Sequence, residues 1–234
     1  DYLEQNRIGF AMGPAIVPIV PAAVLFDLAV GDFSVRPDRE MGFKACQNAS
    51  WKVREGNVGA GAGATIGKFE GYDRCTKSGL GTWSVSLKNG LTVGAIVAVN
   101  ALGDVLDGKG TIIAGLRGEK GGYPGTLNVW KEAGSLKSPG MGQNTTIAVV
   151  ASNAVLNKNQ ATKVAQMAQN GLAMVVSPAH TMYDGDTIFA LATGRIEADV
   201  NLVGSLSAEV LAQAIIRAVL NSSSIKGYRA WNDV

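Results

Sequence analysis

The chain has 234 residues, 47% hydrophobic and 17% charged, with a net charge of +2. Such a chain buries a substantial core, and its composition excludes a largely disordered protein. Basic residues do not form a block, so nucleic acid is not an expected partner. Two cysteines favour a reducing compartment, and the longest apolar run, residues 16–30, is too interrupted to span a membrane. We therefore expect one soluble, cytoplasmic domain.

The first part of the chain predicts two helices and extended segments. Residues 1–7 are typical of the end of a helix, and without an initial methionine we expect a preceding segment. Residues 14–20 predict an extended run, and the apolar residues 22–28 predict a buried strand. A helix starts after Pro37, continues over residues 41–51, and is expected to pack on a sheet.

A glycine-rich segment, residues 58–68, ends in Lys68. It is not a Walker A loop, because Ala62 and Phe69 stand where glycine and serine or threonine are required. The dinucleotide fingerprint also fails, since Ile66 replaces its last glycine. The segment predicts a close approach of the backbone and one lysine, which is either a site residue or a solvated surface residue.

The middle of the chain predicts antiparallel strands followed by a long loop. Residues 82–87 and 91–100 flank an Asn-Gly turn and predict a hairpin. Asn100 ends its second strand, where it either caps a turn or directs its amide into a site. Residues 111–114 predict a short strand, and residues 115–142 predict a functional or mobile loop.

The last part predicts alternating strands and helices. The expected strands cover residues 145–151 and 188–192, with an extended stretch at 173–176. Residues 157–172 have one apolar face and predict a helix capped by Asn157. A second helix is expected from Ser207 to Asn221, and the tail around Trp231 is expected to contact a neighbouring subunit.

Several catalytic classes are disfavoured by the inventory of side chains. His180 is the only histidine and there is no Gly-x-Ser-x-Gly elbow, which disfavours a serine triad. No metal-ligand spacing joins it to the cysteines. Asp184 and Asp186 suggest either a cation site or a tight turn before a strand. We expect no cofactor and no metal.

The Asn144–Thr145 junction is a candidate for self-cleavage. A threonine at a chain start carries its nucleophilic hydroxyl beside its own amine, whose unperturbed pKa is roughly 7.7–8.0. A threonine pair opening a strand is also explained by β-propensity alone. Other residues supply a cation near the amine, an amide donor and orienting acids. These are Lys68, Asn100, Asp184 and Asp186.

Three ordered segments resemble a known family. They read GAGATIGK at 61–68, GQNTTI at 142–147 and HTMYDGDTIFA at 180–190. They are similar to the L-aminopeptidase/D-esterase (β-peptidyl aminopeptidase) family of self-processing N-terminal-nucleophile amidases. The Asn-Thr junction and the His-Thr-x-x-Asp-Gly-Asp-Thr pattern most resemble its nylon-oligomer (6-aminohexanoate oligomer) hydrolase branch.

The resemblance implies an α/β fold, an αββα sandwich like that of N-terminal-nucleophile hydrolases but differently connected. It implies a large subunit ending at Asn144, with a linker at about 115–144, and a small subunit, residues 145–234, that together form one domain. Thr145 would be the nucleophile, Lys68 and Asn100 the active-site lysine and asparagine, and Asp184 and Asp186 the paired acids. Small peptides or amino-acid amides and oligomers would be hydrolysed through an acyl-threonine intermediate, in oligomers of processed heterodimers.

Two departures keep alternatives open. The family carries a longer N-terminal part, so we expect an incomplete large subunit here, and Phe26 stands where several members have tyrosine. An acyltransferase of the ornithine acetyltransferase type shares the threonine chemistry. A catalytically inactive structural or binding member is the other alternative, and the sequence does not specify the substrate.

Overall fold

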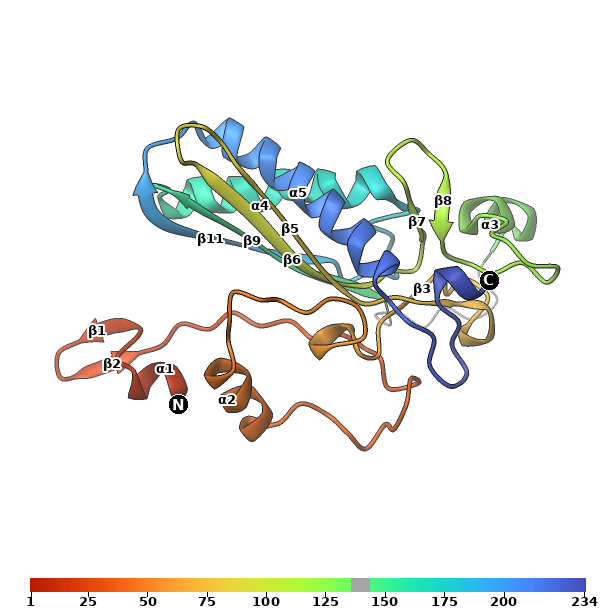
Figure 1. The fold of residues 1–234 in the computed structure, drawn as a ribbon, viewed down its shortest axis with the longest axis horizontal. Coiled ribbons are helices and arrows are strands. Elements are labelled where there is room, and N and C mark those ends of the chain that lie inside the picture. Colours follow the sequence, from red (N-terminus) through yellow and green to blue (C-terminus); the bar gives the residue numbers. More distant parts are fainter. Residues whose placement is uncertain (136–143) are drawn as a thin grey trace.

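The computed structural model describes residues 1–135 and 144–234, and its centre is a four-stranded sheet (Figure 1). The order is β11-β9-β6-β5. Both β5–β6 and β6–β9 are antiparallel, whereas β9–β11 is parallel. The strands are β5 (Leu80–Ser86), β6 (Thr92–Asn100), β9 (Thr145–Ala154) and β11 (Thr187–Ile196).

Two long helices cover one face of this sheet, as Figure 1 shows: α4 (Lys158–Val175) and α5 (Val200–Leu220). Strand residues alternate between faces, and the fully buried Val93, Val97 and Val99 of β6 belong to the core beneath the helices. Alternation therefore places Asn100, the residue after Val99, on the opposite face. By length and composition α5 could span a membrane, but most of its apolar window is buried within the protein.

Smaller elements surround the sheet. Three further sheets pair β1 (Phe10–Met12) with β2 (Ala15–Val17), β3 (Thr65–Ile66) with β4 (Thr76–Lys77), and β7 (Asp104–Leu106) with both β8 (Ile112–Ala114) and β10 (Val176–Ser177). The remaining α-helices are α1 (Tyr2–Gln5), α2 (Arg39–Gln47) and α3 (Thr126–Ala133). Three short 3₁₀ turns are η1 (Gly59–Gly61), η2 (Tyr72–Arg74) and η3 (Trp231–Asp233).

Several expected elements are confirmed. The hairpin, the strand beginning at Thr145 and the helix capped by Asn157 are all present. Asn157 and Gln160 form a capping box, each side chain accepting from the other residue's backbone N–H. Of the expected sandwich, the described residues show the four-stranded sheet with a layer of two helices on one face, beside the smaller sheets.

Other expectations are wrong, each for a physical reason. Residues 22–28 form no strand, and Val24 is 84% exposed, so the apolar run does not indicate burial there. Helix α2 has no buried residue and does not pack on a sheet. The stretch expected to be loop contains α3, whose first residue Thr126 is anchored to buried Asp104.

Two further errors concern the C-terminal part. Residues 173–175, expected to be extended, still belong to α4, which ends at Val175. Helix α5 begins at Val200 rather than Ser207, because Asp199 caps it by accepting the Asn201 N–H. Ser207 lies inside the helix, where its hydroxyl donates to the Val203 carbonyl. In the tail, the Trp231 indole donates to Leu220 O at 3.0 Å within its own chain, and the contact with a neighbouring subunit stays a prediction.

Close packing of α5 on β5 requires a glycine at position 81. A Cβ at Gly81 would lie 2.0 Å from Ala214 O and 2.5 Å from Ala218 N. We expect Gly81→Ala to lower the free energy of unfolding by about 1–3 kcal/mol, the usual cost of overpacking. Urea unfolding of the variant and the wild-type chain measures this change in the free energy of unfolding. Gly42→Ala in exposed α2 is the control and should lose nothing, since no atom approaches that position; equal stabilities of the two variants would contradict the prediction.

Candidate active site

The β6–β9 pairing brings Asn100 and Thr145 together. They are Cα partners in the antiparallel ladder, so their side chains share the sheet face that α4 and α5 leave uncovered. Both residues are nevertheless buried, at 1% and 6% exposure. Two other segments reach them: the Asn100 amide donates to Phe26 O at 3.2 Å and accepts from the Thr65 N–H. The segment expected to be a strand thus lies against the site instead.

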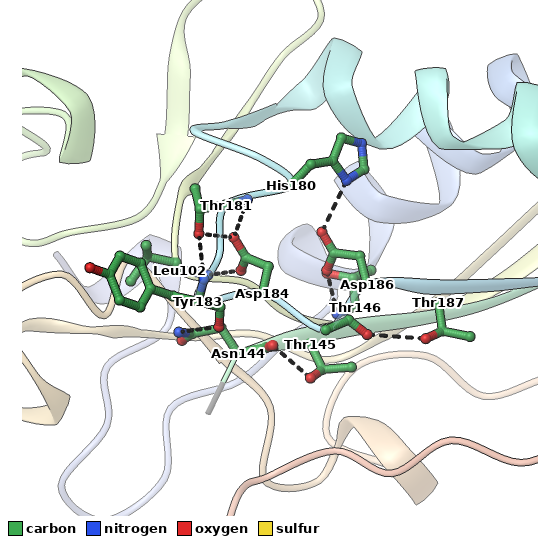
Figure 2. A network of polar contacts seen from close by, with 11 residues as sticks. Leu102, Asn144, Thr145, Thr146, His180, Thr181, Tyr183, Asp184, Asp186 and Thr187 are labelled. Atoms are coloured by element: carbon green, nitrogen blue, oxygen red, sulfur yellow. Dashed lines mark hydrogen bonds and ion pairs between the residues drawn. The ribbon is translucent and has the colours of Figure 1, made fainter. Parts of the chain in front are cut away.

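The carbonyl group of Asn144 has two hydrogen-bond donors, of which Figure 2 shows the Thr145 hydroxyl. The Thr145 hydroxyl donates to Asn144 O at 2.6 Å, and the Gly185 N–H donates to the same oxygen at 2.7 Å. A Cβ at Gly185 would lie 3.0 Å from Thr145 Oγ1, so a side chain would crowd the hydroxyl. The candidate scissile carbonyl is therefore polarised from both sides. Gly142 and Gln143, which precede Asn144 in the GQNTTI segment, lie outside the described residues.

The paired acids orient the backbone around Thr145. Asp186 Oδ1 accepts the Thr146 N–H at 2.8 Å, and Asp184 Oδ1 accepts the Leu102 N–H at 3.2 Å. The other oxygen of Asp184 accepts from the amide and hydroxyl of Thr181. As Figure 2 shows, the two carboxylates thus tie the turn between them to the ends of β6 and β9.

Lys68 is held by Asn100. Its Nζ donates to Asn100 Oδ1 at 2.7 Å and to Asn100 O at 2.9 Å, and the side chain is buried. Burial lowers the pKa of Lys68 to about 7, although the negative charges of Asp184, Asp27 and Asp186 oppose that shift. The surface-lysine alternative is therefore wrong. Lys68 is linked to Thr145 through Asn100, which accepts hydrogen bonds from the lysine and pairs with the threonine in the β6–β9 ladder.

The candidate residues come together at one end of β6 and β9, and the sequence reasoning missed three contributors. Gly185 provides an N–H donor, Thr65 provides another, and His180 Nδ1 lies 3.4 Å from Asp186 Oδ2. Burial raises the pKa of Asp186, and its hydrogen bond from the Thr146 N–H opposes that rise. For Gly185, the position between the two acids in the sequence was a signal that could have indicated its role. Nothing in the sequence spacing indicated the Thr65 contact, because it depends on how β3 packs.

The structure offers no obvious metal ligands at this site. Within residues 1–135 and 144–234, no three histidine, cysteine or acidic side chains gather as a metal-binding group. The two acids that suggested a cation site instead accept hydrogen bonds from backbone N–H groups. What the arrangement provides is a hydroxyl and a backbone N–H that donate to one carbonyl, with a side-chain amide and a buried lysine at the end of the neighbouring strand, which suits acyl-transfer chemistry.

Comparison with known proteins identifies the family. The model of peptidase family S58 matches residues 2–232. The chain belongs to peptidase family S58. Among relatives of this family, an uncharacterized aminopeptidase of Mycobacterium leprae is 41% identical over 251 residues, spanning 97% of the chain and 67% of the relative. A 6-aminohexanoate-oligomer endohydrolase of Agromyces sp. is 26% identical over 236 residues, spanning 91% of the chain and 64% of the relative.

A solved structure supports the fold. The L-aminopeptidase D-Ala-esterase/amidase of Ochrobactrum anthropi, described as a variant of the N-terminal-nucleophile hydrolase fold, aligns with a TM-score of 0.53 at 22% identity. The alignment covers 81% of this chain and 54% of that one, so the chain spans about half of the solved protein. The family and fold predicted from the sequence motifs are confirmed, and the names of the S58 relatives are those of amide-bond hydrolases.

The buried Lys68 predicts a pH-dependent stability. Its pKa is lower in the folded chain, about 7, than its ordinary 10.5, so the unfolded chain binds more protons between these values. The free energy of unfolding should therefore rise as pH increases from 7 to 10, by at most roughly 5 kcal/mol from this group. In Lys68→Met this rise in the free energy of unfolding should be absent. Urea unfolding of both proteins at pH 7 and pH 10 measures the difference.

Exposed Lys88 provides the matched control. Lys88→Met should keep the pH dependence of the wild-type chain, because it removes an exposed lysine and leaves the buried Lys68 in place. Identical pH dependence in all three proteins would contradict a depressed Lys68 pKa.

Proposed function

We propose that this S58 chain is a self-processing amidohydrolase whose nucleophile is Thr145, released by cleavage after Asn144. The observation that carries the proposal is the Asn144 carbonyl, flanked by the Thr145 hydroxyl at 2.6 Å and the Gly185 N–H at 2.7 Å. The chain spans only part of its relatives, so the activity of the whole protein is part of this proposal.

Self-cleavage begins with an N-to-O acyl shift. The Thr145 oxygen bonds to the Asn144 carbonyl carbon, the peptide C–N bond breaks, and the hydroxyl proton passes to the departing nitrogen. Negative charge develops on the carbonyl oxygen, where the Gly185 N–H already donates. Water then hydrolyses the ester, leaving a carboxylate on Asn144 and a free amine on Thr145.

The released amine then serves as the base in substrate hydrolysis. It takes the proton of its own hydroxyl, the hydroxyl oxygen attacks the substrate carbonyl, and the protonated amine returns the proton to the leaving amine. Water resolves the acyl-threonine by the same route. The Asn100 amide opposite Thr145 supplies a donor for the oxyanion, and Lys68 fixes the orientation of that amide. The substrate class is a small peptide, an amino-acid amide or an oligomer of such units, as the names of the relatives suggest.

Intact-mass analysis tests the first stage. The wild-type chain should yield two fragments, residues 1–144 and 145–234, while Thr145→Ala should remain whole because it lacks the attacking oxygen. Thr145→Ser keeps a hydroxyl and should still be cleaved. Thr146→Ala, which leaves the attacking hydroxyl in place, is the matched control. An intact wild-type chain after prolonged incubation would overturn the proposal.

Asn100→Asp tests the oxyanion donor in the hydrolytic stage. The substitution retains an acceptor for Lys68 and removes the amide N–H groups. Hydrolysis of amino-acid p-nitroanilides by the processed protein should fall roughly 10²- to 10³-fold in kcat, as for loss of one oxyanion donor. The control Asn128→Asp changes an exposed amide in α3 and should leave kcat unchanged. An unaltered kcat in Asn100→Asp would remove Asn100 from this role.

A further inference from the structure

A second buried lysine lies outside the chemistry described so far. Lys77 is fully buried, and its Nζ donates to Gly61 O at 2.9 Å, Ala64 O at 3.0 Å and Ser78 O at 2.5 Å. An ammonium group has three hydrogens, so each of them is used. Among the described residues, no carboxylate forms an ion pair with Lys77.

Such a group is costly to maintain. Removing an ammonium from water without a carboxylate in direct contact is unfavourable, and an apolar side chain of similar length would avoid that cost. Two of its three acceptors, Gly61 O and Ala64 O, belong to the glycine-rich segment, at the end of η1 and just after it. The ammonium is thus the internal anchor of this segment.

The anchored segment leads directly to Asn100. Thr65 follows Ala64 and is the Cα partner of Lys77 in the β3–β4 pair. The Thr65 N–H donates to Asn100 Oδ1 at 3.2 Å, beside the Lys68 ammonium. Because both groups are donors, the amide oxygen points to Thr65 and Lys68. The NH₂ group points away from them and donates to Phe26 O at 3.2 Å. If Thr65 moved, the amide oxygen of Asn100 would lose one of the two donors that fix its orientation.

We propose that Lys77 is a positioning residue, which holds residues 61–65 so that the Asn100 amide keeps its oxygen toward Thr65 and Lys68 and its NH₂ toward the oxyanion. The effect on catalysis rests on the proposed function, whereas the effect on the segment itself does not. Lys77 touches no reacting atom; it acts through Asn100.

A double-mutant cycle tests the coupling. Lys77→Met removes the charge and the three donors with little change in side-chain length, and should lower kcat for p-nitroanilide hydrolysis roughly 10- to 100-fold, as for a small misplacement of a catalytic group. In the Asn100→Asp background the same substitution should have no further effect on kcat. The two carboxylate oxygens of the aspartate are equivalent, and the variant has no NH₂ group whose orientation could be lost. KM should change little in either background.

Hydrogen exchange tests the anchor without any activity. In Lys77→Met, deuterium uptake should increase over residues 59–66 and remain unchanged over β9. Lys77→Gln, which keeps two donors, should show a smaller increase and serves if the methionine variant does not fold. Lys88→Met, in an exposed turn, should match the wild type in both assays.

The outcomes separate the two proposals. Unchanged exchange over residues 59–66, or an equal kcat loss from Lys77→Met in both backgrounds, would overturn the positioning role. If the wild-type chain neither cleaves itself nor hydrolyses an anilide, the proposed function fails, and the exchange measurement still decides whether Lys77 anchors the segment.

Discussion

The register between β6 and β9 is the constraint on which this site depends. Eight residue pairs join the strands, and the last of them is Asn100 with Thr145. The buried side chains of Val97, Val99, Ala148 and Val150 fix which residues face the helices. A slip of one residue would reverse every side chain of the strand and turn Thr145 under α4 and α5. The hydrophobic core, which touches none of the chemistry, therefore decides where the hydroxyl points.

Around that register, the site is built largely from groups that constrain one another. The carboxylates of Asp184 and Asp186 accept from backbone N–H groups at the ends of β6 and β9, and Asn100 accepts from both Lys68 and Thr65. Burial makes each of these polar groups costly to leave without a partner, so the set is favourable only when it is complete. The same burial that lowers the pKa of Lys68 thus also fixes its position.

The sequence predicted the parts of this structure that depend on local chemistry. The turn at Asn89-Gly90, the cap at Asn157 and the motifs around Lys68, Thr145 and the paired acids were all readable from neighbouring residues. What it did not reveal depends on contacts between distant segments. The exposed course of residues 22–28, the seven-residue earlier start of α5 and the burial of Lys77 follow from which surfaces meet, and residue spacing does not encode that. Gly185 is intermediate: its place between two acids was visible, but its hydrogen bond to Asn144 O was not.

The place of β9 in the sheet has a consequence for the chain end that cleavage would create. New termini usually fray, because their first residues lack partners on at least one side. Strand β9 is an interior strand, paired with β6 along one edge and β11 along the other, and the Thr146 N–H is additionally held by Asp186. The β11 ladder begins at Ile147, so an amine released at Thr145 would be held by the pairing with Asn100 on β6 and by the Asp186 contact one residue further on. The two pieces would also remain one folded body, since the cut severs a covalent bond and leaves the strand pairing intact.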